Sequence, residues 1–174
     1  FRSASVTPIF KRGDRAQLGN YRPIALLNSV SKVLEKVVAQ QLYKHVDSHL
    51  PNAQSGFRRN DGTTLQLARI IHTLEQALDN GNAALVCFFD LSKAFDRVWH
   101  QGLLAKLHHL GLESLALQWV SAYLHGRQQR VHINDSYSSW APVPAGVPQG
   151  SVLGPLLFII YTRSEEHTSE LQSR

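Results

Sequence analysis

The stretch Ala83-Ala84-Leu85-Val86-Cys87-Phe88-Phe89-Asp90 decides how this chain is interpreted. Residues 83–89 are apolar and uncharged, a pattern typical of a strand that is buried on both faces. We therefore predict a buried strand that presents Asp90 at its end. A carboxylate in this position can bind a divalent metal ion. The alternative is that Asp90 caps a helix that begins near Ser92.

A second informative stretch is Ala145-Gly146-Val147-Pro148-Gln149-Gly150-Ser151, which precedes an apolar segment that ends at Tyr161. Gly146 and Gly150 lack Cβ atoms, so the backbone can approach another group closely there. Gln149 offers both a hydrogen-bond donor and an acceptor. The simpler alternative is a Pro-Gly turn that leads into a helix, which is common on any fold.

The remaining elements follow from hydrophobic periodicity and turn residues. Strands are expected at residues 6–11, 21–27 and 130–134, with a turn at 135–139 and a returning strand at 140–143. Helices are expected at residues 29–49, from Thr63 to a stop at Asn80-Gly81, at 101–110, at 113–125 and from Ser151 onward. Thr63 and Gln66 are expected to form a capping box. This mixture without regular alternation of strand and helix predicts the α+β class.

Two predicted helices carry apolar residues at helical spacing, and we expect these residues to be buried. In the helix at 29–49 they are Val30, Val33, Leu34, Val37, Val38, Leu42 and Val46. In the helix from Thr63 they are Leu67, Ile70, Ile71, Leu74 and Leu78.

The composition limits the classes of function. A net charge of +5 over 174 residues favours an anionic partner such as nucleic acid, although simple solubility explains it equally well. No apolar run is long enough to span a membrane. The single cysteine, Cys87, lies in the apolar stretch, so we expect a buried thiol and a reducing intracellular location, either nucleus or cytoplasm. The nine histidines show no zinc-binding spacing.

Five stretches in the same order resemble the reverse transcriptase domain of non-LTR (LINE-type) retrotransposons, over about residues 5–162. They are the two stretches above together with residues 6–14, 20–24 and 54–58. The resemblance implies a right-hand polymerase, with a fingers region at residues 1–81 and a partial palm at 82–162. It also implies an RNA-directed DNA polymerase that extends a DNA primer on an RNA template, using deoxynucleoside triphosphates and two Mg²⁺ ions.

The same resemblance implies roles for particular residues. Asp90 would be the catalytic metal ligand, and Phe95 would lie under the sugar of the nucleotide and exclude a 2′-hydroxyl. The other nucleotide-binding residues implied are Lys11, Arg22, Gln149 and Gly150. The template-binding residues implied are Gln54, Phe57 and Arg58.

These roles have structural alternatives. Phe95 could equally be a core residue, and residues 54–58 could be a surface loop that Phe57 anchors. Lone basic residues such as Lys11 and Arg22 are usually solvated. We interpret Asp96 as structural and expect it to pair with Lys93 or Arg97.

Residues 163–174 depart from the pattern before them and resemble the translation of a sequencing-library adapter, so we expect a tail that is not native. The hairpin with paired aspartates that follows in the family is absent. We therefore expect this chain to be inactive by itself. The alternative function is a noncatalytic module that binds RNA or DNA and derives from a polymerase.

Overall fold

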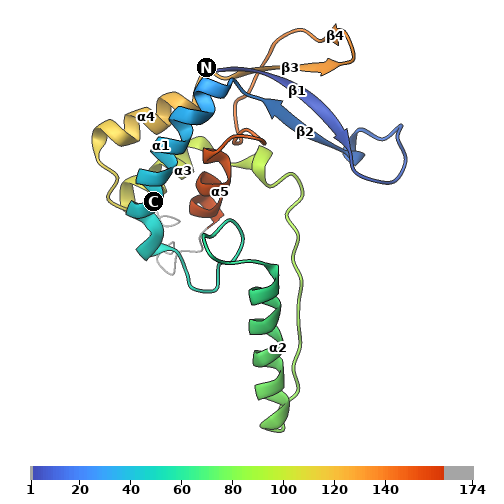
Figure 1. Ribbon diagram of the computed structural model, residues 1–174, viewed down its shortest axis with the longest axis vertical. Helices are drawn as coiled ribbons and strands as arrows, with labels where there is room; N and C mark the ends of the chain where they lie inside the picture. Colours follow the sequence, from blue (N-terminus) through green and yellow to red (C-terminus); the bar gives the residue numbers. More distant parts are fainter. Residues whose placement is uncertain (1, 163–174) are drawn as a thin grey trace, which may run out of the picture. The chain divides into compact units, whose positions relative to one another are not determined.

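The computed structural model of the chain describes residues 2–162 (Figure 1). Its strands are β1 (Ser3–Phe10), β2 (Tyr21–Leu26), β3 (Gln128–Ile133), β4 (Ser136–Tyr137) and β5 (Ala141–Pro142). Its α-helices are α1 (Ser29–Val46), α2 (Thr63–Asp79), α3 (His100–His109), α4 (Ser114–Leu124) and α5 (Leu153–Thr162). Short 3₁₀ helices lie at Leu18–Asn20, Asp47–His49 and Phe95–Arg97.

The chain divides into two compact units. Residues 50–92 form one unit, which contains α2. The described residues of 1–49 and 93–174 form the other, which contains the sheet and the remaining α-helices. The sheet therefore takes strands from both sides of the predicted boundary at residue 82. The assignment of fingers to 1–81 and of palm to 82–162 stays a prediction.

The sheet mixes antiparallel and parallel pairs, in the order β2-β1-β3-β4 with β5 also paired to β3. β1 and β2 form an antiparallel hairpin from Ser5↔Leu26 to Phe10↔Tyr21. β1 pairs with β3 in parallel, from Ser3↔Gln128 to Val6↔Val131. A parallel pair needs a long crossover, and here residues 11–127 supply it. Helices and a mixed sheet confirm the α+β class.

Alternation along the strands separates two faces of the sheet. Ala4, Val6 and Ala25 lie on one face and form a small buried cluster. Ile9 and Leu26 belong to the opposite face and are exposed.

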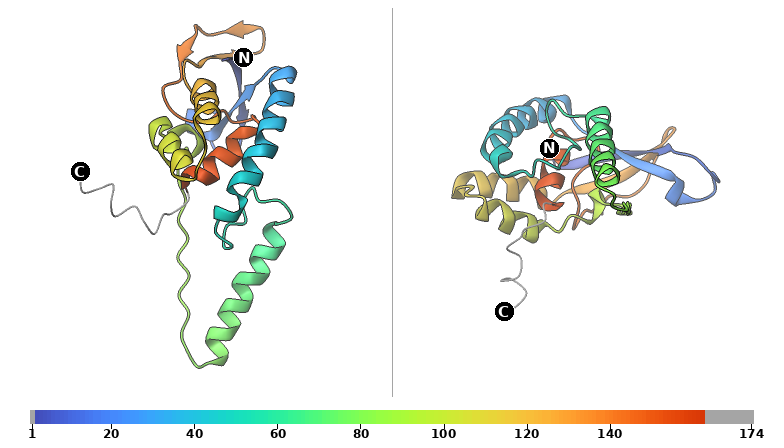
Figure 2. Two further views of the ribbon diagram at one scale, coloured as in Figure 1. Left: turned by 90° about the vertical axis from the view of Figure 1, so that its left-hand side faces the viewer. Right: turned by 90° about the horizontal axis from the view of Figure 1, so that it is seen from below.

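A second core lies between the helices. α5 packs against both α1 and α3, and α3 packs against α4 (Figure 2). The buried residues of this core include Leu42, Val46, Leu103, Leu107, Val120, Leu124, Leu153, Leu157 and Ile160. α5 is therefore the central helix of this unit, which explains why its sequence is almost entirely apolar.

The burial predicted for α1 is wrong in its first half. Val30 and Val33 are both 65% exposed, and Leu34 and Val37 are exposed as well. The buried side is instead formed by Ser31, Glu35, Leu42 and Val46. On this side Glu35 accepts hydrogen bonds from the start of α5.

The helix predicted from Thr63 is confirmed, and so is its end, since Asn80 is the C-cap and Gly81 has a φ of +72°. Two details are wrong. The N-cap is Gly62 without a side-chain bond, so there is no capping box. None of its residues is buried, because residues 50–92 contain no other helix or strand against which α2 could pack.

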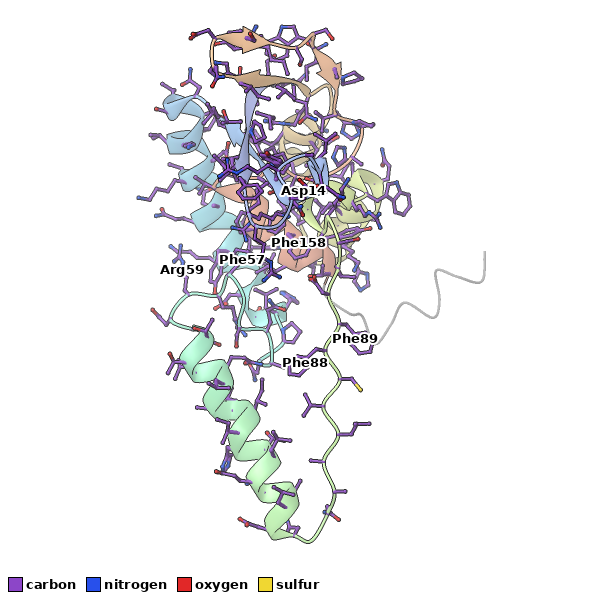
Figure 3. All side chains as sticks on the ribbon, turned by 90° about the vertical axis from the view of Figure 1, so that its right-hand side faces the viewer. Asp14, Phe57, Arg59, Phe88, Phe89 and Phe158 are labelled. Carbon is purple, nitrogen blue, oxygen red and sulfur yellow. The ribbon has the colours of Figure 1, made fainter. Side chains whose placement is uncertain are left out.

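The strand predicted at residues 83–89 is not formed. These residues have no regular secondary structure, and Leu85, Phe88 and Phe89 are 90%, 87% and 93% exposed. Figure 3 shows the rings of Phe88 and Phe89 standing out from the extended backbone. Cys87, expected to be buried, is exposed too. A strand needs a neighbour for its backbone groups, and no strand of the described residues pairs with this segment.

Other sequence predictions are confirmed within a few residues, including the strand β3, its returning partner β5 and the helices α3, α4 and α5. The turn predicted at 135–139 is wrong, because residues 136–137 form β4 and pair with β3. In residues 2–162, no helix combines the length and apolar character that a membrane span requires.

Candidate functional site

The loop at residues 145–150 is attached on one side to the turn at residues 94–98. The Gly146 amide donates to the Val98 carbonyl (2.8 Å), and the Val147 amide donates to the Phe95 carbonyl (2.9 Å). Gly146 has a φ of +89°, and a Cβ atom there would lie 2.9 Å from the Asp96 backbone. The close approach of the two segments therefore requires glycine at this position.

The other side of the loop is attached to β2. The Ala25 amide donates to the Gln149 carbonyl (2.8 Å). Gly150 has a φ of +106°, and a Cβ atom there would lie 2.9 Å from the Ala25 carbonyl oxygen. Backbone hydrogen bonds on both sides thus fix the loop between β2 and the turn, as the two glycines suggested from the sequence.

The side chain of Gln149 is oriented by Asp96. Its Nε2 donates to Asp96 Oδ1 at 3.0 Å. We expected Asp96 to pair with Lys93 or Arg97, but its partner is this amide. A glutamine amide can form several hydrogen bonds, so one bond to Asp96 fixes its direction and leaves capacity for a ligand.

Gln149 and Asp96 line a cavity of about 340 Å³. Lys93 and the loop at 142–148 line it as well, and Ala4, Val6, Pro23 and Ala25 form the wall contributed by the sheet. Arg127, Gln128 and Gln129 line it too, so the cavity combines apolar residues with charged and amide side chains that a small molecule could contact.

Sequence reasoning missed Glu35, which is 2% exposed. Its Oε2 accepts hydrogen bonds from the amides of Val152 (2.8 Å) and Leu153 (3.2 Å). The hydroxyl of Ser31 donates to its Oε1 at 3.2 Å. The signal was present in the sequence, since residues 31, 35, 38, 42 and 46 keep helical spacing.

Phe95 stacks on Phe158, with ring centroids 4.5 Å apart and an interplanar angle of 18°. Its side chain is half-buried, and it is not among the residues that line the cavity. This contact is the one expected of a core residue, and the role in sugar selection stays a prediction.

Lys11 and Arg22 are exposed and do not line the cavity. Arg22 lies opposite Ile9 in the β1–β2 hairpin, and the Lys11 amide donates to the Asn20 carbonyl. This register places the two cations near each other on the same face of the sheet, which is the face opposite the buried Ala4, Val6 and Ala25.

The residues predicted to bind template lie in the unit formed by residues 50–92. Gln54 Nε2 donates to the Gly56 carbonyl (2.9 Å), and Arg58 donates to the Pro51 carbonyl (2.8 Å). Phe57 is exposed and has a φ of +61°. Gln54 and Arg58 thus stabilise their own loop, and template binding stays a prediction.

The loop before α2 is held by a cluster of polar side chains. Arg69 donates to Asp61 at 2.7 Å, and the hydroxyl of Ser55 contacts both Asp61 and Gln66. The hydrogen bond from Arg69 lowers the pKa of Asp61, and the Gly62 amide adds to this effect.

Asp90 is exposed in the segment that has no regular structure. Among residues 2–162, no group of three or more histidine, cysteine, aspartate or glutamate side chains is placed to bind a metal ion. Two Mg²⁺ ions require several oxygen ligands in a nearly ideal geometry. The described residues therefore do not form a complete site for them.

Comparison with known proteins identifies the class. Residues 9–170 match the family described as reverse transcriptase (RNA-dependent DNA polymerase). The chain is 40% identical over 164 residues to the RNA-directed DNA polymerase from mobile element jockey of Drosophila melanogaster, covering 92% of this chain and 18% of that protein. It is 38% identical over 165 residues to the probable RNA-directed DNA polymerase from transposon BS of the same species, covering 93% and 18%.

The probable RNA-directed DNA polymerase from transposon X-element, also of Drosophila melanogaster, is 39% identical over 145 residues, covering 82% of this chain and 16% of that protein. The chain belongs to the reverse transcriptase family, and the predicted resemblance to non-LTR retrotransposon enzymes is confirmed. It spans less than a fifth of the length of these relatives. The prediction that residues 163–174 form a foreign tail lies outside the described residues.

Replacing Gly146 by alanine should detach the loop from the turn at 94–98. The new Cβ atom would meet the Asp96 backbone, and alanine disfavours a positive φ. We expect the free energy of unfolding to fall by about 2 kcal/mol, measured by urea denaturation. Gly19→Ala is the matched control, because nothing lies within 4 Å of its Cβ position. Equal stability of the two variants would contradict the close packing of the loop.

Tyr123 should make stability depend on alkaline pH. Burial raises the pKa of Tyr123 to about 12, and the Glu35 carboxylate adds to this effect while Ser151 and Arg127 oppose it. The pKa of Tyr123 is higher in the folded than in the unfolded state. The contribution of the neutral phenol to the free energy of unfolding is therefore complete below about pH 10, and it is lost as the pH rises toward 12. This rise in the pKa of Tyr123 from 10.0 to about 12 corresponds to a loss of about 2–3 kcal/mol in the free energy of unfolding once the phenol is ionised.

The measurement is the free energy of unfolding of the wild type and of Tyr123→Phe between pH 9 and 12. The wild type should lose more stability than the variant over this range. Tyr137→Phe, at an exposed position, should behave like the wild type. Parallel curves for wild type and Tyr123→Phe would show that this phenol does not titrate as described.

Proposed function

We propose that this chain forms the part of an RNA-directed DNA polymerase that binds the incoming deoxynucleoside triphosphate beside an RNA template and a DNA primer. The observation that carries the proposal is the loop at 145–150. It is fixed between β2 and the turn at 94–98, and it holds the Gln149 amide in the wall of a cavity.

The charges around the cavity fit such a ligand. Lys93 is part of the cavity wall, and an ammonium group suits phosphate oxygens. Lys11 and Arg22 lie on the other face of the β1–β2 hairpin and do not line this cavity, so their binding to the triphosphate stays a prediction from the resemblance. Gly150, whose Cβ side faces the Ala25 carbonyl, would contribute by seating the loop, and Gln149 supplies a donor and an acceptor for the base or for the template.

Asp90 would supply one carboxylate ligand for the Mg²⁺ ions that nucleotidyl transfer requires. One carboxylate cannot fix two magnesium ions, because magnesium gives up its water reluctantly. No cluster of further ligands exists among residues 2–162. We therefore propose that this chain binds nucleotide but does not extend a primer unless further ligands are supplied.

A second candidate function, a noncatalytic module that binds RNA or DNA, is favoured by an exposed stack on the β3–β4 hairpin. The Arg130 guanidinium lies 3.9 Å from the centre of the Tyr137 ring and 4.7 Å from that of Trp140. His132 stacks on Tyr137 as well, with ring centroids 4.4 Å apart. Tyr137 and Trp140 are both exposed. Because Arg130 and His132 occupy the faces of the Tyr137 ring, Trp140 is the ring of this stack that can receive a base of a single strand.

Nucleotide binding should depend on Gln149. We expect residues 1–174 to bind a deoxynucleoside triphosphate in the presence of Mg²⁺, and Gln149→Leu to weaken the affinity about tenfold, as the loss of one or two ligand hydrogen bonds would. Equilibrium dialysis with labelled nucleotide measures this. The control is Gln118→Leu on the exposed side of α4. Equal affinity of Gln149→Leu and the control would remove Gln149 from the site.

Primer extension should not occur with residues 1–174. The assay uses an RNA template, a DNA primer and either Mg²⁺ or Mn²⁺, with Asp90→Asn as the background control. The wild type should incorporate no more deoxynucleotide than this control, because the metal ligands are incomplete. Incorporation above the control would show that the chain completes its metal site in a way that residues 2–162 do not reveal.

A further inference from the structure

The buried carboxylate of Glu35 has no part in the function proposed above, yet it is bonded at both oxygens. It lies on α1, and it contacts the start of α5 more than a hundred residues away in the sequence. Burying a charged group is costly unless it is fully hydrogen-bonded. Three donors satisfy Glu35, namely the amides of Val152 and Leu153 and the hydroxyl of Ser31.

The physical reason for this arrangement is the unpaired end of α5. The first amides of a helix have no partner within the helix, and the helix dipole favours a negative charge there. Ser151 provides a local acceptor for the Gly154 amide and donates its own hydroxyl to the Pro148 carbonyl. The Glu35 carboxylate accepts hydrogen bonds from the two amides that lie between Ser151 and Gly154, those of Val152 and Leu153. The cap of α5 is thus built jointly by its own sequence and by α1.

The capped residues directly follow the loop that carries Gln149. At its other end this loop is held by Gly146 and Val147 against the turn at 94–98. Between these two attachments, the Gln149 carbonyl accepts from the Ala25 amide. Glu35 therefore determines where the loop ends, and the turn determines where it begins.

We propose that Glu35 is a positioning residue, which holds the loop at 145–150 in the conformation that directs Gln149 into the cavity. The effect on nucleotide binding rests on the function proposed above. The effect on the loop itself does not, and the two can be measured separately.

A carboxylate suits this position better than its isosteres. One of its oxygens accepts two amides at once, while the other accepts a hydroxyl. Glutamine keeps one accepting oxygen and can still cap α5. Leucine has a similar volume and no acceptor, so it would leave the amides of Val152 and Leu153 without a partner.

The experiment measures amide hydrogen exchange by NMR on residues 1–174, for the wild type, Glu35→Gln and Glu35→Leu. Exchange at Val152 and Leu153 reports the cap, and exchange at Ala25 reports the seating of Gln149 on β2. We expect Glu35→Leu to raise exchange at all three amides by about tenfold or more, and Glu35→Gln to raise it much less.

The matched control is Leu42→Ala, a buried position on the same helix that forms no bond to α5. It should lower overall stability while Ala25 exchange, corrected for that change, stays at the wild-type value. A purely structural role for Glu35 predicts the opposite, namely that Ala25 responds equally in Glu35→Leu and Leu42→Ala. That outcome would overturn the proposal.

If Glu35→Leu does not fold, Glu35→Gln decides the matter. A rise in exchange at Val152 together with Ala25 supports the proposal, and a rise at Val152 alone contradicts it.

Nucleotide affinity is the second readout, measured with a deoxynucleoside triphosphate and Mg²⁺. Glu35→Leu should weaken binding about as much as Gln149→Leu, about tenfold, and Glu35→Gln should restore most of it. If the wild type binds no nucleotide, the proposed function fails, while the exchange at Ala25 still decides the role of Glu35. If nucleotide binds and Glu35→Leu loosens the loop without weakening affinity, only the link to function is wrong.

Discussion

The close seating of residues 145–150 against two backbones is the constraint on which the candidate site depends. Gly146 lies against the turn at 94–98 and Gly150 against β2, each where a Cβ atom would come within 2.9 Å of backbone. This closeness lets the loop form backbone hydrogen bonds of 2.8–2.9 Å on both sides, and such bonds are directional. Gln149, between the two glycines, is therefore held by main-chain geometry, and its side chain needs only the bond to Asp96 to select one orientation.

The same constraint connects the two cores of the larger unit. The loop follows β5 and leads into α5, which is the helix buried between α1 and α3. The hydrogen bond from the Ala25 amide to the Gln149 carbonyl thus links the sheet to the segment that leads into this helix. Helix packing and loop position are coupled through the few residues at the start of α5, and Glu35 bonds to two of them.

Local patterns in the sequence predicted the elements well and their burial poorly. Periodicity and turn residues gave β1, β2, α1, α3, α4 and α5 nearly in full, because these signals act over a few residues. Burial depends on what the rest of the chain supplies. Val30 and Val33 are exposed, while Glu35 is buried where it accepts hydrogen bonds from the start of α5. For the candidate site, the two glycines and Gln149 were recognisable from the sequence, whereas Glu35 and the bond between Gln149 and Asp96 were not.

The segment at residues 83–90 shows the limit of pattern reasoning most sharply. Its composition is that of a strand covered on both faces, yet a strand is a property of a pair, since its backbone groups bond to a neighbour and not within the segment. Among residues 2–162 no strand pairs with it, and its apolar side chains remain in water. Asp90, at the end of this segment, is exposed as well. The acid side chain that most clearly suggested metal chemistry from the sequence thus lies in a segment without regular structure, whereas the loop that carries Gln149 is held by glycine contacts and by the hydrogen bonds of Glu35.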